Sequence, residues 1–243
     1  MGIPCFLMVE SGLQRVWLRR YAGSNEPCTK GSYHNAMTLV GDFPESKDTE
    51  GYVEQIPAET YQGDTRWPAR CPCGYEFGKG DIFQVFTRSL YRRTDGGNLP
   101  GGAAHVSLEE APVGAMWNAW WQGEGRRLKA EGRAEFFPGR GVGPDGMSLV
   151  VRMPGGHDWG IDGRCSNCDS PCARCAKPYH QCQCRYPEGY KDSHPHQCWV
   201  RHGAPPKLTV DKGAPGQSCK AGAGSIIVPG WHGFLRNGIL EPC

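Results

Sequence analysis

The sequence has almost no net charge and no long apolar run, and each absence excludes a class of protein. Its 27 Lys and Arg residues face 25 Asp and Glu residues, which gives a formal net charge of +2. Proteins that bind nucleic acid through general electrostatics carry a much larger basic excess, so this balance does not favour such a role. No window of 18 consecutive apolar residues exists, so we expect no transmembrane helix and no membrane partner.

Export and catalytic signatures are also missing. The apolar run near the N-terminus follows no basic segment and precedes no small-residue cleavage site, so we expect no signal peptide. The cysteines should then be reduced in a cytosol, where closely spaced cysteines are more often metal ligands than disulfides. The sequence has neither the HExxH spacing of zinc proteases nor the HxE…PCxxC pattern of nucleobase deaminases. These absences favour a protein without catalytic activity.

What the sequence does have is a stretch rich in Cys and His, from Cys165 to Cys198. It holds seven of the 13 cysteines and three of the 8 histidines. The stretch has almost no aliphatic residues, so it cannot bury a hydrophobic core of its own. Metal binding is therefore the first candidate for the interaction that holds it together.

The inner part of this stretch has the spacing Cys172-x2-Cys175-x6-Cys182-x-Cys184. Zinc takes four tetrahedral ligands, and a CxxC turn directs two thiolates of one loop at one ion. The second pair follows after a single reversal of the chain. We therefore predict a structural Zn2+ site at these four cysteines, with His180 as an alternative to one member of the CxC pair.

The outer members of the stretch form a second set. Cys165-x2-Cys168 is another ligand pair, which His196 and Cys198, or His194, can complete. The alternative is that Cys168 and Cys198 are buried thiols, because free Cys is among the most buried residue types. A second zinc site and a pair of buried thiols both stay open at this point.

A further pair lies far away, at Cys71-Pro-Cys73-Gly, and resembles half of a zinc-ribbon knuckle. The glycine suits a turn in which backbone N–H groups point towards sulfur. We expect either a metal site completed at long range or a tight turn with two buried thiols. The candidates for completion are two pairs further along the chain: Cys165 with Cys168, or Cys198 with Cys219. One zinc ion is therefore expected, and the three sets allow two or three.

Composition and patterning predict a mixed but β-dominated (α+β) fold of short antiparallel strands with zinc-stapled loops. The 35 Gly and 20 Pro residues favour turns and short strands over long helices. The clearest strands are 147–153 and the runs in 199–243, which have the pattern of a β-meander. Residues 82–87 favour a strand, with a helix as the alternative, and residues 22–70 should be mostly loop. One main helix is predicted at 112–122, where a proline can occupy the first turn.

These elements predict three parts within one compact unit. Residues 1–164 form an N-terminal β-rich body that carries the helix. Residues 165–198 form an inserted zinc loop, and residues 199–243 form a C-terminal β-meander that packs on the body.

Two groups of residues offer alternatives to a structural role. Cys219 and His232 are the minimal pair for a Cys/His hydrolase, although proximity in the sequence does not show that they meet. An open zinc site would serve a hydrolase as well. His157, Asp158 and Asp162 follow the strand predicted at 147–153, where such side chains bind a ligand or satisfy backbone groups.

The chain also has two local basic patches. Aromatic residues interleave the first of them, which would suit contact with nucleic acid, whereas a solvated surface is the more usual role of such runs. The patches are Arg88, Arg92 and Arg93, and Arg126, Arg127, Lys129 and Arg133.

Several motifs together resemble a group of proteins encoded by tailed bacteriophages, especially phages of high-GC bacteria. The motifs are CPCGY at 71–75, APVGAMW at 111–117, MPGGHDWGID at 153–162, SNC at 166–168, CWVRHGAPPKLTVDK at 198–212, and CKAGAGSI with WHGFLRNG within 219–238. The segment between Cys168 and Cys198 is longer and richer in Cys here than in that group. The resemblance implies a phage product, either a virion component or an accessory protein, and it brings no activity with it.

We therefore expect a non-catalytic, zinc-binding structural or interaction protein of phage type, such as a capsid or tail component. Its partners would be other virion proteins, and its location the bacterial host cytoplasm or the virion. The alternatives are a Cys/His or zinc-dependent hydrolase and an accessory protein that contacts nucleic acid.

Overall fold

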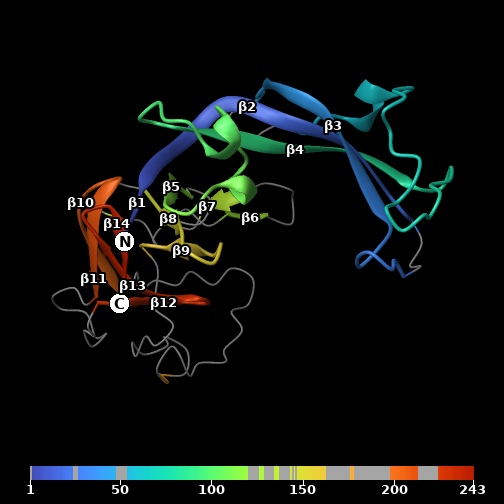
Figure 1. Ribbon diagram of the computed structural model, residues 1–243. Coiled ribbons are helices and arrows are strands. Elements are labelled where there is room, and N and C mark those ends of the chain that lie inside the picture. The colour runs from blue at the N-terminus through green and yellow to red at the C-terminus, as the bar shows by residue number, and fades with distance from the viewer. Residues whose placement is uncertain are drawn as a thin grey trace. The chain divides into compact units, whose positions relative to one another are not determined.

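The computed structural model describes residues 2–23, 27–47, 54–119, 126–128, 134–136, 143, 145, 147–162, 176–177, 198–212 and 224–243. Within these residues the chain is β-dominated, as the sequence predicts, and its helices are single 3-10 turns at Ala58–Tyr61, Pro100–Gly102 and Leu108–Glu110. The strands are labelled in Figure 1. They are β1 (Ile3–Pro4), β2 (Phe6–Tyr21), β3 (Asn35–Pro44), β4 (Ile82–Arg93), β5 (Ala115–Asn118), β6 (Arg126–Leu128), β7 (Ala134–Phe136), β8 (Leu149–Arg152), β9 (Asp158–Gly160), β10 (Trp199–Ala204), β11 (Lys207–Lys212), β12 (Ile226–Val228), β13 (Trp231–Arg236) and β14 (Ile239–Pro242).

The chain divides into two compact units. Unit 1 comprises residues 1–9, 93–100 and 111–243, and unit 2 comprises residues 10–92 and 101–110. Strands β2 and β4 each begin in one unit and end in the other. The N-terminal body predicted over residues 1–164 therefore contributes to both units.

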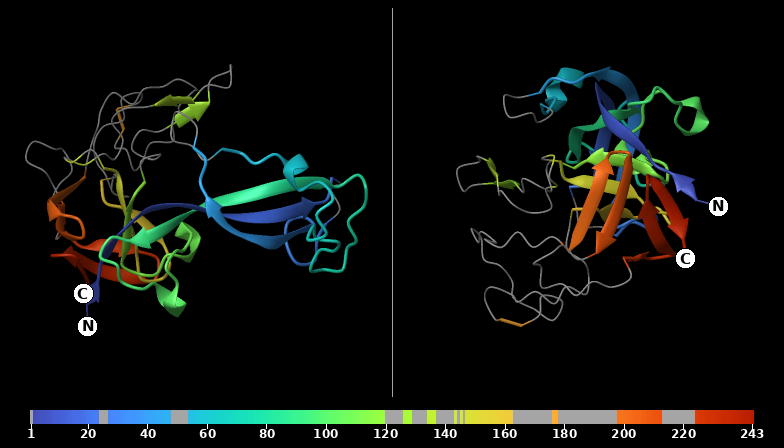
Figure 2. Two further views of the ribbon diagram at one scale, coloured as in Figure 1. Left: turned by 90° about the horizontal axis from the view of Figure 1, so that it is seen from above. Right: turned by 90° about the vertical axis from the view of Figure 1, so that its left-hand side faces the viewer.

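Unit 2 is built on β2, β3 and β4, which run alongside one another (Figures 1 and 2). Strand β3 pairs antiparallel with β2 from Leu13 to Tyr21, with a bulge opposite Val16 and Trp17. Val16, Leu18 and Val85 are buried on one face of this sheet, where the segment that holds Tyr61 and Trp67 packs against them. Alternate residues of a strand point to opposite faces, so Trp17 and Arg19 belong to the other face.

Unit 1 contains the larger core, which β-strands from three sheets enclose. One sheet has the order β1-β14-β13-β12, a second is the β10–β11 hairpin, and in the third β5 lies between residues Phe6–Met8 of β2 and strand β8, which pairs with β9. The strands predicted at 147–153 and in 199–243 are confirmed here. Strands β6 and β7 pair with each other.

The predicted helix at 112–122 is wrong over its described residues. Residues Ala115–Asn118 form strand β5, which is parallel to β2 and antiparallel to β8. The Glu110 carboxylate accepts from the Ser107 N–H, which is one of the two bonds of a capping box, and also from the Ser107 hydroxyl, but the helix lasts one 3-10 turn. Gly114 then takes a φ of +87° and lies against the carbonyl oxygen of Pro4, too close for a side chain. Because β5 has a neighbour on both edges and is buried, its run of apolar residues lacks the alternation that identifies a strand.

Candidate metal centre

Four side chains with metal-binding atoms converge in unit 2: Cys28, His34, Cys71 and Cys73. Their sulfur and nitrogen atoms all lie within 4.8 Å of one another, and this is the one such group in the described part of the chain. This Cys3His group can bind a metal ion. We call it the Cys3His centre.

The first half of the centre comes from the connection between β2 and β3. Tyr21 pairs with Asn35 across the two strands, and the Ala22 N–H donates to the His34 carbonyl at 2.9 Å. These contacts close the base of the loop and fix His34 at its end. Cys28 lies within the same loop, and the Lys30 N–H donates to its sulfur at 3.4 Å.

The second half is a tight hairpin in the segment that precedes β4. The Cys71 N–H donates to the Tyr75 carbonyl, and the Gly74 N–H donates to the Cys71 carbonyl, both at 2.9 Å. Gly74 has a φ of +99°, which a residue with a side chain adopts only under strain, so the turn that brings Cys71 and Cys73 together depends on this glycine. The Phe77 N–H continues the hairpin by donating to Ala69 at 2.9 Å.

Two side chains from the strands hold this hairpin in place. Arg20, from β2, donates to the Pro68 carbonyl at 3.3 Å and to the Gly78 carbonyl at 2.8 Å, one on each flank of the hairpin. Asp81 accepts from the N–H groups of Gly23 and Gly78 at 3.1 and 2.7 Å, which links the two halves of the centre. The position of the hairpin is therefore set by hydrogen bonds as well as by the Cys3His centre.

The distances within the centre match those of ligands that share one ion. The Cys28 and Cys71 sulfur atoms are 3.7 Å apart, and the His34 Nδ1 lies 3.1 Å from the Cys73 sulfur. His34 stacks on the ring of Tyr75, with centroids 4.2 Å apart and an interplanar angle of 9°. This stacking fixes the imidazole plane with Nδ1 towards the sulfur atoms.

Backbone N–H groups surround the sulfur atoms and favour their thiolate form. The pKa of Cys71 is lowered to about 6: burial acts to raise it, but hydrogen bonds from the Cys73 and Asn35 N–H groups and from His34 outweigh burial. The Tyr75 N–H acts in the same direction on Cys73, whereas burial and the neighbouring thiols Cys71 and Cys28 raise the pKa of Cys73 overall. One thiol of the centre is thus prepared for ionisation, and a cation would remove the repulsion that opposes ionisation of the others.

The centre is closed to large molecules. Cys71 and His34 are 4% and 6% exposed, and the other two cysteines are partly buried. A metal ion held by all four side chains would have its tetrahedral positions filled by protein atoms. Such a site positions chain segments and leaves no room for a substrate at the ion.

The sequence identified half of this centre. Cys71 and Cys73 were expected to be either metal ligands or buried thiols, and the structure joins them to Cys28 and His34, which sequence reasoning did not select. Among the described residues the partners of Cys71 and Cys73 are Cys28 and His34; Cys165, Cys168 and Cys219, which were expected to complete the site, lie outside the described residues. The only advance signal was a Cys and a His six residues apart in a turn-rich segment.

Most of the other predicted ligands lie outside the described residues: Cys165, Cys168, Cys172, Cys175, His180, Cys182, Cys184, His194, His196 and Cys219. The zinc sites proposed for them, and the meeting of Cys219 with His232, stay predictions. Cys198 is fully buried in the core of unit 1 beside Trp199. His232 is exposed on β13, where its carbonyl accepts a hydrogen bond from the Cys243 N–H.

Asp162, which follows β9, binds a backbone N–H group and belongs to a buried ion pair. Asp162 accepts from the Leu149 N–H at 2.9 Å and from the guanidinium of Arg201 at 2.8 Å. Arg201 also binds Asp145, and its side chain is 2% exposed. Burial raises the pKa of Asp162 against the lowering effect of these two donors. Of the two roles expected for His157, Asp158 and Asp162, the satisfaction of backbone groups thus applies to Asp162.

The first basic patch is largely neutralised by ion pairs. Arg88 binds Glu109 at 2.8 Å, and Arg93 binds Asp95 at 2.6 Å. The side chains of the second patch lie outside the described residues. These ion pairs compensate two of the three positive charges of the first patch.

Comparison with protein-family models, curated proteins and solved structures finds no match to this chain. None of the helices in the described residues has the length and apolar character needed to span a membrane.

Proposed function

We propose that this chain is a non-catalytic zinc-binding protein with a structural or interaction role. Three cysteines and one histidine form one of the donor sets found in structural zinc sites. Zn–S bonds of about 2.3 Å in a tetrahedron place two sulfur atoms about 3.8 Å apart. The 3.7 Å between the Cys28 and Cys71 sulfur atoms is close to this value. The four converging donors are the observation that carries the proposal.

A structural role fits better than a catalytic one because the protein supplies all four donors. A catalytic zinc ion usually has three protein ligands and an open position for water. Here the fourth donor is present, and Cys71 and His34 are buried. The zinc ion would link the β2–β3 loop to the hairpin before β4, two segments that are distant in sequence.

The small core of unit 2 supports a stabilising role for zinc. In the described residues of this unit, Val16, Leu18 and Val85 form one buried cluster, and few other apolar side chains are buried: Ala22, Leu90, Tyr91 and Val106. Structural zinc in small modules supplies about 10 kcal/mol or more of folding free energy at neutral pH. An ion at the Cys3His centre would therefore add a contribution to the stability of this unit comparable with that of its buried aliphatic side chains.

The phage assignment is part of the proposal and depends on the motif resemblance given above. A zinc-stapled β-module without an open catalytic site suits a virion component or accessory protein. Other virion proteins would then be its partners, and it would occur in the host cytoplasm or in the virion. The Cys-rich segment from Cys165 to Cys198 would add one or two further zinc ions.

Elemental analysis of the purified full-length protein tests the zinc proposal. We expect at least one zinc ion per chain, and we expect Cys73→Ser to reduce the content by one. Cys172→Ser/Cys175→Ser removes a separately predicted site and should reduce the content by one without affecting the Cys3His centre. Zinc content that Cys73→Ser leaves unchanged, or zinc-free protein with the same fold, would refute the role given to the centre.

A further inference from the structure

The sheet of unit 2 has an open face lined by aromatic residues around one arginine. On β2 and β3, residues that pair directly across the strands share a face, so Trp17 lies with Leu39, and Arg19 lies with Met37. Phe86 of β4 joins them through Trp17, whose ring centroid is 5.6 Å from its own. We call this surface the aromatic face; it consists of Trp17, Arg19, Tyr21, Tyr33, Met37, Leu39 and Phe86.

The aromatic face lies opposite the core of unit 2 and is accessible. Tyr33, Met37 and Leu39 are 42%, 50% and 53% exposed. Single exposed apolar side chains are ordinary, but three neighbours on one sheet face form a patch of the kind found at interaction sites. Strand β3 is also an edge of the sheet, so a partner can approach it from the side as well.

Arg19 occupies the centre of this face. Its guanidinium carbon lies 5.2 Å from the ring centroid of Tyr21, 5.6 Å from that of Tyr33 and 5.9 Å from that of Phe86. Its hydrogen bonds go to the Gln84 side chain and to the Tyr33 hydroxyl. Both acceptors are neutral, and in the described part of the chain Arg19 has no carboxylate partner.

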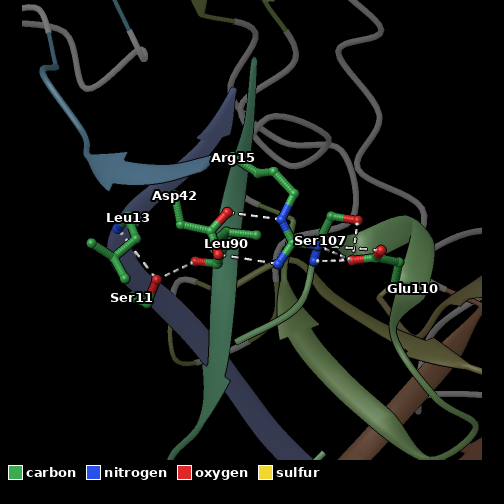
Figure 3. Close-up of polar contacts among 7 residues, drawn as sticks. All are labelled: Ser11, Leu13, Arg15, Asp42, Leu90, Ser107 and Glu110. Carbon is green, nitrogen blue, oxygen red and sulfur yellow. Dashed lines mark hydrogen bonds and ion pairs between the residues drawn. The ribbon is translucent and has the colours of Figure 1, made fainter. Parts of the chain in front are cut away.

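Arg15 shows the contrasting arrangement on the same strand. It binds Asp42 at 2.8 Å and Glu110 at 3.2 Å, so two carboxylates compensate its charge (Figure 3). Arg15 and Arg19 are four residues apart on β2 and point to the same face. The chain thus neutralises one arginine of this face and leaves the other as a positive charge among aromatic rings.

We propose that the aromatic face binds a segment of a partner protein in which a carboxylate side chain lies beside apolar ones. The carboxylate would pair with Arg19, and charge-assisted hydrogen bonds of this type are about twice as strong as neutral ones. The apolar side chains would cover Tyr33, Met37 and Leu39. The proposal extends the interaction role proposed above and rests on it.

Charge distinguishes this partner from two others. A second copy of the chain packed face to face would bring two Arg19 side chains into one interface, and Asp42 on the same side of the sheet is already paired with Arg15. A nucleic acid would approach a unit that carries 10 Lys or Arg against 13 Asp or Glu residues, a formal charge of −3. A protein segment with one carboxylate at Arg19 avoids the repulsion between two arginines, and it also avoids the repulsion between a polyanion and this acidic unit.

The aromatic face adjoins the Cys3His centre through consecutive residues. Tyr33, which contacts Arg19 and Tyr21, immediately precedes His34. A metal ion that fixes His34 would therefore also fix the ring of Tyr33. Binding at the aromatic face should accordingly be stronger in the metal-loaded protein than after chelation.

NMR titration of the full-length protein with two matched probes tests the proposal. The probes are N-acetylphenylalanine, which has a carboxylate, and its amide, which does not. We expect the acid to shift the Arg19 Nε–H signal and the Leu39 and Met37 methyl signals, with an affinity about tenfold above that of the amide. Equal affinity for acid and amide, or shifts confined to other surfaces, would refute the proposal.

Two variants and a third probe complete the experiment. Arg19→Gln should abolish the preference for the acid, whereas Arg66→Gln, which removes the same charge from a loop of the same unit, should keep it. Oligo(dT) that binds this face more tightly than the acid would overturn the proposal in favour of nucleic acid. Zinc is measured on the same samples: zinc-loaded protein without acid preference refutes the aromatic face alone, and zinc-free protein refutes the function proposed above.

Discussion

Replacing Cys28 with serine should unfold unit 2 while leaving unit 1 intact. Cys28 supplies one of the four donors of the Cys3His centre and anchors the β2–β3 loop to the hairpin that contains Cys71. Serine keeps the size of the side chain but is a poor zinc ligand, so the variant should lose the ion. The expected effect follows from a comparison of how much the metal ion and the hydrophobic core each contribute to the folding free energy of unit 2.

Loss of the ion would remove a contribution about as large as that of the aliphatic side chains that unit 2 buries. Full burial of an aliphatic side chain contributes about 1.5–3 kcal/mol, so the buried Val and Leu residues of this unit in the described residues contribute roughly 8–15 kcal/mol before any chain entropy is counted; they are Val16, Leu18, Val85, Leu90 and Val106. Structural zinc contributes about 10–16 kcal/mol in small modules. Unit 1, in contrast, buries a cluster of twelve residues that does not include the centre.

Hydrogen–deuterium exchange measured by mass spectrometry separates the two units. In Cys28→Ser, and in the wild type after chelation, peptides from β3 and β4 should lose protection, while peptides from β8 and β13 keep it. Cys243→Ser, which changes an exposed cysteine of unit 1, should exchange like the wild type. Zinc loss without any loss of protection in β3 would show that the hydrogen bonds around the hairpin suffice to hold unit 2.

Three further predictions concern unit 1. Arg201→Met should destabilise the protein by about 3–5 kcal/mol in urea unfolding, because it leaves the buried Asp162 unpaired, and a change under 1 kcal/mol would contradict the role of the pair. The Arg93 guanidinium lowers the pKa of Asp95 to about 2, so this ion pair stabilises the native state fully above the ordinary Asp pKa of about 3.9 and loses its effect as the pH falls towards 2. In Arg93→Gln, NMR titration should show the Asp95 pKa raised towards the ordinary value but still below it, because the Gly97 N–H still donates to the carboxylate. Burial raises the pKa of Cys5 to about 12, so iodoacetamide at pH 8 should label this thiol far more slowly in the native protein than in urea, as peptide mass mapping would show.

The strands that the sequence predicted have clear local signals. Residues of β8 and the C-terminal strands are short apolar or β-branched runs between Gly and Pro, which identify strands without knowledge of the fold. Strand β3 was missed in a segment expected to be loop because its alternation of side chains is broken. The bulge opposite Val16 and Trp17 shifts the register at Val40, and the period of two residues is lost there.

Half of the candidate site was predictable, again because only some of its residues have a local signal in the sequence. Cys71 and Cys73 are separated by one residue and followed by the glycine that their turn needs, so the local sequence identified them. Cys28 and His34 reach them only because β2 pairs with β3 and because Arg20 holds the hairpin beside the loop. Contacts of this range depend on the fold, and no local spacing encodes them.

The pairing of β1 with β14 determines the order in which the two units can fold during synthesis. Ile3 pairs with Leu240, so the four-stranded sheet of unit 1 lacks this pairing until residue 240 has left the ribosome. Every residue of unit 2, including all four donors of the Cys3His centre, lies before residue 111 and is available much earlier. Contacts between distant parts of a chain form slowly, and domains generally fold as they emerge. Unit 2 can therefore acquire its metal ion and fold first, while the strands of unit 1 that precede it wait for their partners.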